Sequence, residues 1–238
     1  MLPLLLTNLI SLAAAQSSIA ADLPRGFIYL SKIAPDIQQH MAYAGPDNFF
    51  GRPARGYEAP ACILTEKAAK ALSRAQRVFT PKNLSLVVLD CYRPESAVRD
   101  FASWVDAGGN IDPLWSPKTP RNQLIKQGYI GRRSAHSRGS TVDIAIVSNA
   151  DPTTWTKPTC GIAMPNTLDF GSGFDCFDAI SRTTYRPLSE AAIANRKLLL
   201  DTMKAAGFRN YAGEWWHFTL MGEPFPKKRF DFPIRAAE

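Results

Sequence analysis

The sequence predicts an α+β domain with a small mixed or antiparallel sheet and flanking helices. Stretches with the apolar spacing of helices and short apolar runs typical of strands both occur, but they do not alternate regularly as in a doubly wound fold. Apolar residues make up 45% and charged residues 21% of the 238 residues, which is typical of a globular protein. No repeat or linker divides the chain. We therefore expect residues 22–238 to form a single domain.

Three segments have the spacing of helices. Residues 65–79 repeat apolar side chains along one helical face. A second helix is expected to begin with Pro94, which suits a first helical position, and to end before Gly108. A third is expected over 189–206, where Gly207 follows.

Three further segments are typical of strands. Residues 84–89 form an apolar run, and residues 215–220 are rich in aromatic side chains. Residues 141–147 alternate, and Asp143 lies opposite the most apolar face, free to point into a cleft. Residues 22–60 are irregular.

The first residues have most features of a secretory signal peptide. Leu2 to Leu12 is an apolar stretch too short to span a bilayer stably, and Ala13 to Ala15 supplies the small residues of a cleavage site. No Lys or Arg precedes the stretch, unlike a typical signal. We expect residues 1–21 to contain a signal peptide that is cleaved after Ala15 or near Ala21, and the protein to be periplasmic or otherwise exported. A buried N-terminal helix is the alternative.

The cysteines agree with export. An even count in an oxidising compartment indicates two disulfides, and four cysteines permit three pairings. We favour Cys160–Cys176, which closes a short loop, and Cys62–Cys91, which joins segments on either side of a predicted helix. A four-cysteine metal site is disfavoured because no CxxC pair occurs.

The net charge of +7 suits work near anionic envelope polymers. The basic residues are scattered apart from Lys227 to Arg229, so no stripe for nucleic acid is present and we expect no nucleic-acid partner. No segment after the N-terminus is apolar enough to predict stable membrane insertion. The oligomeric state is not readable from the sequence.

Two short motifs hold two of the three histidines. In the first, His136 lies in a loop, and a glycine turn leads to Asp143 on a strand. In the second, Glu214 and His217 are embedded among aromatic residues, where polar groups are costly unless they have partners. Imidazole and carboxylate suit zinc, and three protein ligands leave a position open, as in catalytic sites. Each motif alone also fits a histidine that binds no metal: a solvated one in the first motif, and one with hydrogen-bond partners in the core in the second.

Glu214 and His217 of the second motif can reach the same site only if the regular strand is interrupted between them. Glu214 and His217 would face opposite sides of a regular strand. We expect Gly213 to place Glu214 in the turn before the strand, so that both side chains reach one site.

A third motif, residues 90–94, ends a buried strand and contains Arg93. Its guanidinium is always charged and could stabilise the negative oxygen that develops on an attacked carbonyl. A structural ion pair with Asp90 is the alternative, and by itself the favoured one.

Taken together, the motifs resemble those of the D-alanyl-D-alanine dipeptidases (VanX type) of the zinc D,D-peptidase family. The SxHxxGxxxD motif is matched by residues 134–143, ExxH by 214–217 and YRP by 92–94. Shorter matches lie at 47–49, 173–175 and 231–233, so the resemblance extends from Leu23 to Pro233. The sequence departs from the family pattern between Val147 and Gly173, where an insert carries Cys160. This difference affects the expected shape of the pocket rim more than the metal site.

The resemblance implies a fold shared with the D,D-peptidases and the Hedgehog signalling domain, and a role for each matched residue. One Zn²⁺ would be held by His136, Asp143 and His217. Glu214 would act as the catalytic base and Arg93 as the stabiliser of the tetrahedral intermediate. Ser134 and Asp175 would line the dipeptide pocket, where Asp175 would meet the free ammonium group.

The predicted activity is hydrolysis of the small dipeptide D-alanyl-D-alanine to two D-alanine molecules, in cell-wall peptide turnover or scavenging. The alternatives are a D,D-carboxypeptidase or L,D-endopeptidase that acts on longer peptidoglycan stems, and a non-catalytic zinc-containing binding module. Asp175 favours the dipeptidase, and the joint presence of Glu214 and Arg93 disfavours the binding module.

Overall fold

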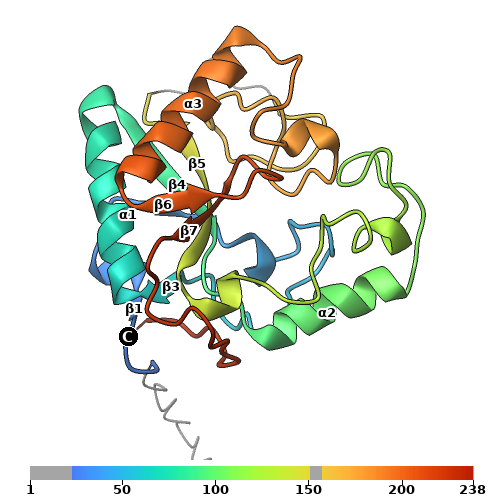
Figure 1. Cartoon of the computed structure of the whole chain (residues 1–238), viewed down its shortest axis with the longest axis horizontal. Coiled ribbons are helices and arrows are strands. Elements are labelled where there is room, and N and C mark those ends of the chain that lie inside the picture. The colour runs from blue at the N-terminus through green and yellow to red at the C-terminus, as the bar shows by residue number, and fades with distance from the viewer. Residues whose placement is uncertain (1–22, 151–156, 238) are drawn as a thin grey trace, which may run out of the picture.

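The computed structural model describes residues 23–150 and 157–237 (Figure 1). The predicted signal peptide lies outside these residues. The main sheet has five strands, in the order β2 (Gln38–Gln39), β4 (Leu84–Asp90), β5 (Thr141–Ser148), β7 (His217–Leu220) and β6 (Phe208–Asn210). β2 and β4 are parallel, and the other pairs are antiparallel. A second, antiparallel sheet joins β1 (Phe27–Tyr29) to β3 (Ile63–Thr65). The predicted mixed α+β class is confirmed.

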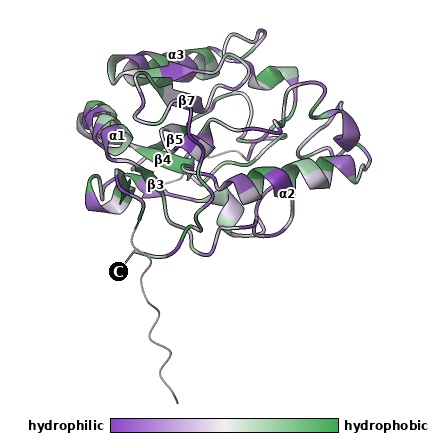
Figure 2. Ribbon diagram, turned by 60° about the horizontal axis from the view of Figure 1, so that its bottom comes forward, coloured by the Kyte–Doolittle hydropathy of each residue, from purple (hydrophilic) through white to green (hydrophobic). Residues whose placement is uncertain are grey.

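The three predicted helices are present as α1 (Glu66–Phe79), α2 (Glu95–Asp106) and α3 (Glu190–Ala205). α1 and α3 contact each other, whereas α2 lies apart from them, at the lower right of Figure 1. In Figure 2 the interior strand β4 is mostly hydrophobic, while all three helices also carry hydrophilic residues. This pattern is typical of helices that cover a buried sheet with one face and meet solvent with the other.

The predicted helix starts were each one residue early. Thr65 and Ser189 precede their helices, and their hydroxyls accept hydrogen bonds from Ala68 N and Ala192 N, so both residues are N-caps. Pro94 is likewise extended, with ψ of 145°, and lies just before α2. At Thr65 and Ser189 the side chain accepts from the first turn while the backbone of the residue is still extended. Pro94 makes no side-chain cap, and its carbonyl oxygen accepts from Ala97 N and Val98 N instead.

The strand predictions were correct for the centre of the sheet and incomplete at its edges. β4 and β5 each extend one residue beyond the predicted end. β7 begins at His217, two residues later than predicted, because Trp215 and Trp216 form a turn. The short strands β1, β2, β3 and β6 were not predicted. They contain two or three residues each, too few to show a period.

Both favoured disulfides are present, Cys62–Cys91 and Cys160–Cys176, and none of the four cysteines is free. The first joins the start of β3 to the residue that follows β4. The second encloses the segment that carries Asp175. Within the described part of the chain, no helix has the length and apolarity needed to cross a membrane.

Candidate metal centre and substrate cleft

The register of the main sheet places three polar residues side by side. Asp90 on β4 pairs with Asp143 on β5, and Asp143 pairs with His217 on β7. Val88 already pairs with Ile144, so β4 holds one extra residue, Leu89, and forms a β-bulge there. Because residues paired across strands share a face of the sheet, Asp90 and His217 lie on the same face as Asp143.

The side chains of His136, Asp143 and His217 converge on one point. Their ligand atoms all lie within 4.8 Å of one another. His136 Nε2 is 3.2 Å from Asp143 Oδ2 and 3.3 Å from His217 Nδ1, and His217 Nδ1 is 3.1 Å from Asp143 Oδ1. Burial alone would raise the pKa of Asp143, but the two histidines hold it below its usual range. The carboxyl group is therefore ionised at neutral pH, as a metal ligand must be.

The local chain explains how His136 reaches this point. His136 begins a short 3-10 helix, His136–Arg138, which ends at Gly139 with a φ of 76°. A side chain at Gly139 would also collide with the ring of Phe27, because its Cβ would lie 2.2 Å from a ring carbon. His136 Nδ1 lies 2.7 Å from the carbonyl oxygen of Cys91, which fixes the ring and directs Nε2 to the cluster.

One atom of the cluster supports a bound cation. Asp143 Oδ1 is buried and has no hydrogen-bond partner among the described residues, and His217 Nδ1 lies 3.1 Å from it. A buried carboxylate oxygen without a donor is costly unless a cation occupies the space in front of it. Two imidazole nitrogens facing the same space supply the remaining ligands. The residues present therefore fit a divalent metal ion.

Glu214 lies beside this cluster, in the turn before β7. Its Oε2 is 3.4 Å from His217 Nδ1 and its side chain is 18% exposed. Burial raises its pKa to about 7. As expected, Glu214 lies outside the strand, but the role of Gly213 is different: its φ is not positive, and a Cβ there would lie 2.6 Å from the ring of Tyr211. Gly213 thus leaves room for that ring.

Arg93 forms the ion pair with Asp90 that the sequence favoured, and it also lines the cleft. Its Nε and Nη2 lie 2.9 and 2.8 Å from Asp90 Oδ2, so the structural ion pair exists. The same Nη2 is 3.6 Å from Asp143 Oδ2, and the residue lines the cleft. Asp90 is fully buried and also accepts a hydrogen bond of 2.6 Å from the hydroxyl of Tyr57. The ion pair therefore holds the guanidinium at the edge of the metal cluster.

Ser134 and Asp175 line the same cleft. Ser134 Oγ accepts a hydrogen bond of 3.2 Å from the backbone N–H of His136. Asp175 is buried, has a φ of 58° and accepts a hydrogen bond of 2.7 Å from the hydroxyl of Tyr43. Burial raises the pKa of Asp175 well above its usual range, although Tyr43 acts in the opposite direction. A cationic partner would restore its charge.

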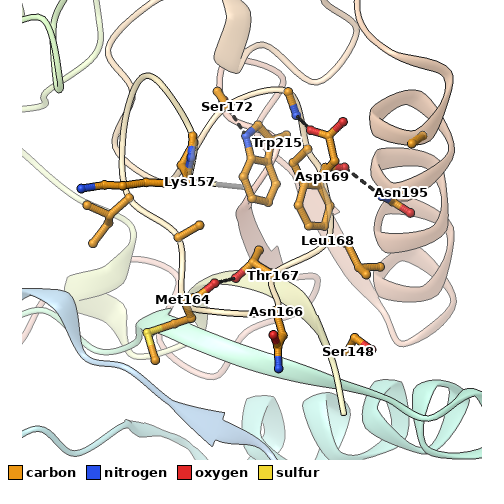
Figure 3. A pocket seen from close by; sticks show the side chains of 18 of the residues that line it. Ser148, Lys157, Met164, Asn166, Thr167, Leu168, Asp169, Ser172, Asn195 and Trp215 are labelled. Carbon is orange, nitrogen blue, oxygen red and sulfur yellow. Dashed lines mark hydrogen bonds between the residues drawn. The ribbon is translucent and has the colours of Figure 1, made fainter. Parts of the chain in front are cut away.

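The cleft that collects these residues has a volume of about 260 Å³. A second cavity, of about 690 Å³, lies between the insert, α3 and Trp215 (Figure 3). In it Trp215 Nε1 donates to Ser172 Oγ, and the carboxylate of Asp169 accepts from Gly171 N and Ser189 Oγ. These polar groups of the second cavity are hydrogen-bonded to one another, whereas the smaller cleft contains the metal cluster and Glu214. The smaller cleft is therefore the candidate site.

The described part of the insert does not line the cleft. Residues of the insert line the second cavity instead, and they are joined to the segment of Asp175 by the Cys160–Cys176 disulfide and by backbone hydrogen bonds between Ile162 and Phe174. The insert therefore affects the cleft by fastening the segment of Asp175, and forms no rim of its own among the described residues.

Comparison with known proteins agrees with this geometry. Residues 24–235 match the model of the Peptidase_M15 family, described as D-ala-D-ala dipeptidase. The chain belongs to this family. It is 36% identical over 210 residues to the D-alanyl-D-alanine dipeptidase of Streptomyces coelicolor, covering 87% of this chain and 98% of that protein. It is 33% identical over 216 residues to that of Enterococcus faecalis, covering 89% and 100%. The dipeptidase of Escherichia coli is 30% identical over 191 residues, covering 80% and 82%.

Peptidase_M15 proteins are metal-dependent, and the cluster of His136, Asp143 and His217 can hold a metal ion in this member. Sequence reasoning missed several polar residues around the cluster. Tyr43 and Tyr57 lie in the segment described as irregular, and nothing local marks them as partners of Asp175 and Asp90.

Asn210 was also missed. It ends β6, and its Nδ2 donates to the carbonyl oxygens of Glu214 and His217 at 2.9 and 3.0 Å. A polar residue at the end of a strand can be found by pattern, but its partners cannot, since the pairing of β6 with β7 was not predicted.

Proposed function

We propose that this protein is a zinc-dependent dipeptidase that hydrolyses D-alanyl-D-alanine to two D-alanine molecules. The observation that carries the proposal is the convergence of two imidazoles and a carboxylate beside Glu214, a mostly buried carboxyl group whose pKa is raised to about 7 by burial. Two nitrogen ligands and one oxygen ligand suit zinc, and a base with a pKa near neutrality suits general acid–base catalysis. The named activity of the relatives supports the substrate.

The bound metal would polarise the scissile carbonyl and acidify a water molecule. Glu214 would accept the proton of the attacking water on a carboxylate oxygen and pass it to the nitrogen of the leaving D-alanine. Arg93 would donate from Nη2 to the oxygen that becomes negative when the carbonyl is attacked. Its ion pair with Asp90 keeps the guanidinium in place before substrate arrives, so little reorganisation is needed.

Asp175 would bind the ammonium group of the dipeptide. It is a buried carboxyl group in the cleft, and Tyr43 is its hydrogen-bond partner. A buried carboxyl group favours a site that accepts a free amine, because a cationic partner offsets the cost of burying its charged form. A longer stem peptide presents a neutral amide at this position. The dipeptidase is therefore favoured over a carboxypeptidase or endopeptidase.

The test compares two substrates and one chelator. The mature protein, loaded with zinc, is incubated with D-alanyl-D-alanine and separately with a stem pentapeptide, and released D-alanine is measured. We expect hydrolysis of the dipeptide alone, lost on treatment with a chelator and restored by zinc. Preferential cleavage of the pentapeptide would instead indicate a carboxypeptidase.

We further propose that the protein acts outside the cytoplasm after cleavage of its signal peptide, after Ala15 or near Ala21. The two disulfides support an oxidising compartment. Amino-terminal sequencing of the mature protein from a periplasmic or culture fraction tests this. An intact N-terminus in a cytoplasmic fraction would contradict it.

A further inference from the structure

We propose that Arg133 forms a subsite for the free carboxylate of the dipeptide, at the opposite end from the ammonium group that Asp175 receives. The inference rests on the proposed dipeptidase function and extends it. No role for Arg133 follows from the motifs, which begin one residue later at Ser134.

The charges that line the cleft single out Arg133. The charged residues that line it are three acidic ones, Asp143, Asp175 and Glu214, and two arginines, Arg93 and Arg133. Arg93 is committed to Asp90 and lies near Asp143. The side chain of Arg133 is exposed and makes no hydrogen bond or ion pair with any residue in 23–150 or 157–237. It is therefore the one cation of the described cleft that can receive an anion without giving up a partner.

The neighbouring arginine shows the contrast. Arg132 forms a bidentate ion pair with Asp106, through Nη1 at 3.0 Å and Nη2 at 2.7 Å, and it does not line the cleft. Two adjacent arginines thus have different surroundings. One is held at the surface by a carboxylate of α2, and the other is left facing the cleft.

The backbone around Arg133 is fixed relative to the metal cluster. A Cβ at Gly131 would lie 2.7 Å from the carbonyl oxygen of Arg133, so the chain turns tightly there. On the other side, Ser134 Oγ accepts from the N–H of His136. The guanidinium is therefore carried on a segment fastened to a residue of the cluster, which holds the backbone of Arg133 at the wall of the cleft.

A dipeptide needs such a cation. Its two charged ends are at most about 7 Å apart in an extended chain, so both must lie within this cleft. The ammonium end has Asp175, whereas the other acidic residues of the cleft, Asp143 and Glu214, offer the carboxylate end no cationic donor. A guanidinium can bind a carboxylate through two parallel hydrogen bonds, and it distinguishes a free carboxylate from a neutral amide. Arg133 would thus select substrates that end at the second residue.

The experiment compares D-alanyl-D-alanine with D-alanyl-D-alaninamide, which lacks the negative charge. The value of kcat/KM is measured on both for the wild type, Arg133→Gln, Arg133→Lys and the matched control Arg132→Gln. If the amide is cleaved too slowly, its Ki against D-alanyl-D-alanine replaces kcat/KM. We expect Arg133→Gln to lose about 10-fold or more in kcat/KM on the free acid, the range of a hydrogen bond to a charged group, and to leave the amide unchanged.

The remaining variants sharpen the result. Arg133→Lys should keep part of the preference for the acid, because it keeps the charge, and Arg132→Gln should behave as the wild type. Equal losses on acid and amide with Arg133→Gln, or no loss on either, would overturn the subsite while the dipeptidase function stands. A wild type inactive on D-alanyl-D-alanine would instead overturn the proposed function, and the subsite with it.

Discussion

Replacing Glu214 by glutamine separates catalysis from metal binding in this site. Glutamine has the same shape, but it cannot accept a proton at neutral pH. Glu214 lies beside the His136, Asp143 and His217 cluster and is not needed to complete it. We therefore expect Glu214→Gln to retain the metal and to lose most of its activity.

The size of the loss follows from the role of the carboxylate. A positioned general base typically contributes about 100- to 10,000-fold to the rate, or about 3 to 5 kcal/mol in the activation free energy. Glu214 is mostly buried, and its carboxylate lies 3.4 Å from His217 Nδ1, close enough to reach a water molecule at the cluster. We expect kcat for D-alanyl-D-alanine to fall within this range, and the metal content to stay at one ion per chain.

The assay measures released D-alanine with D-amino-acid oxidase, and metal content by elemental analysis of the same sample. Glu58→Gln is the matched control, because Glu58 is exposed and paired with Arg235 away from the cleft. It should retain both activity and metal. A Glu214→Gln variant with near wild-type kcat would refute the assignment of the base, and a metal-free variant would show that Glu214 acts as a ligand.

Three further predictions follow from the same geometry. His136→Ala should lose both metal and activity, because it removes one ligand; retention of one tightly bound zinc ion would contradict the cluster. Because burial raises the pKa of Glu214 to about 7 and the reaction needs its carboxylate, kcat/KM should fall as the pH drops through that pKa. A bound cation favours the charged form, so the inflection should lie at or below about pH 7, and an acid limb retained in Glu214→Gln would assign it to another group. Replacing Cys62 and Cys91 by serine should lower the free energy of unfolding by about 3 to 4 kcal/mol, because the disulfide closes a loop of this length. The same change should weaken zinc binding, because the carbonyl oxygen of Cys91 fixes the ring of His136. Denaturant titration and zinc competition measure the two effects, and an unchanged zinc affinity would show that the ring is held without the disulfide.

The secondary-structure predictions that held share one physical property: their signals are local. The three long helices and the central strands repeat apolar residues often enough to show a period. The cap residues Thr65 and Ser189 were assigned to the helices themselves because a cap and a first helical residue look alike in sequence. The edge strands are too short to show any period, and their pairing depends on segments far away in the chain.

The sequence by itself singled out the candidate site residues, because the chain has only three histidines and two of them lie in short motifs with a nearby carboxylate. Only the tertiary structure decided how they meet. The bulge at Leu89 sets Asp90 beside Asp143, and the pairing of β5 with β7 adds His217 to the same row. The different surroundings of Arg132 and Arg133 are likewise set by α2 and the cleft. Register and long-range contacts have no local signal, since they depend on the packing of the whole domain.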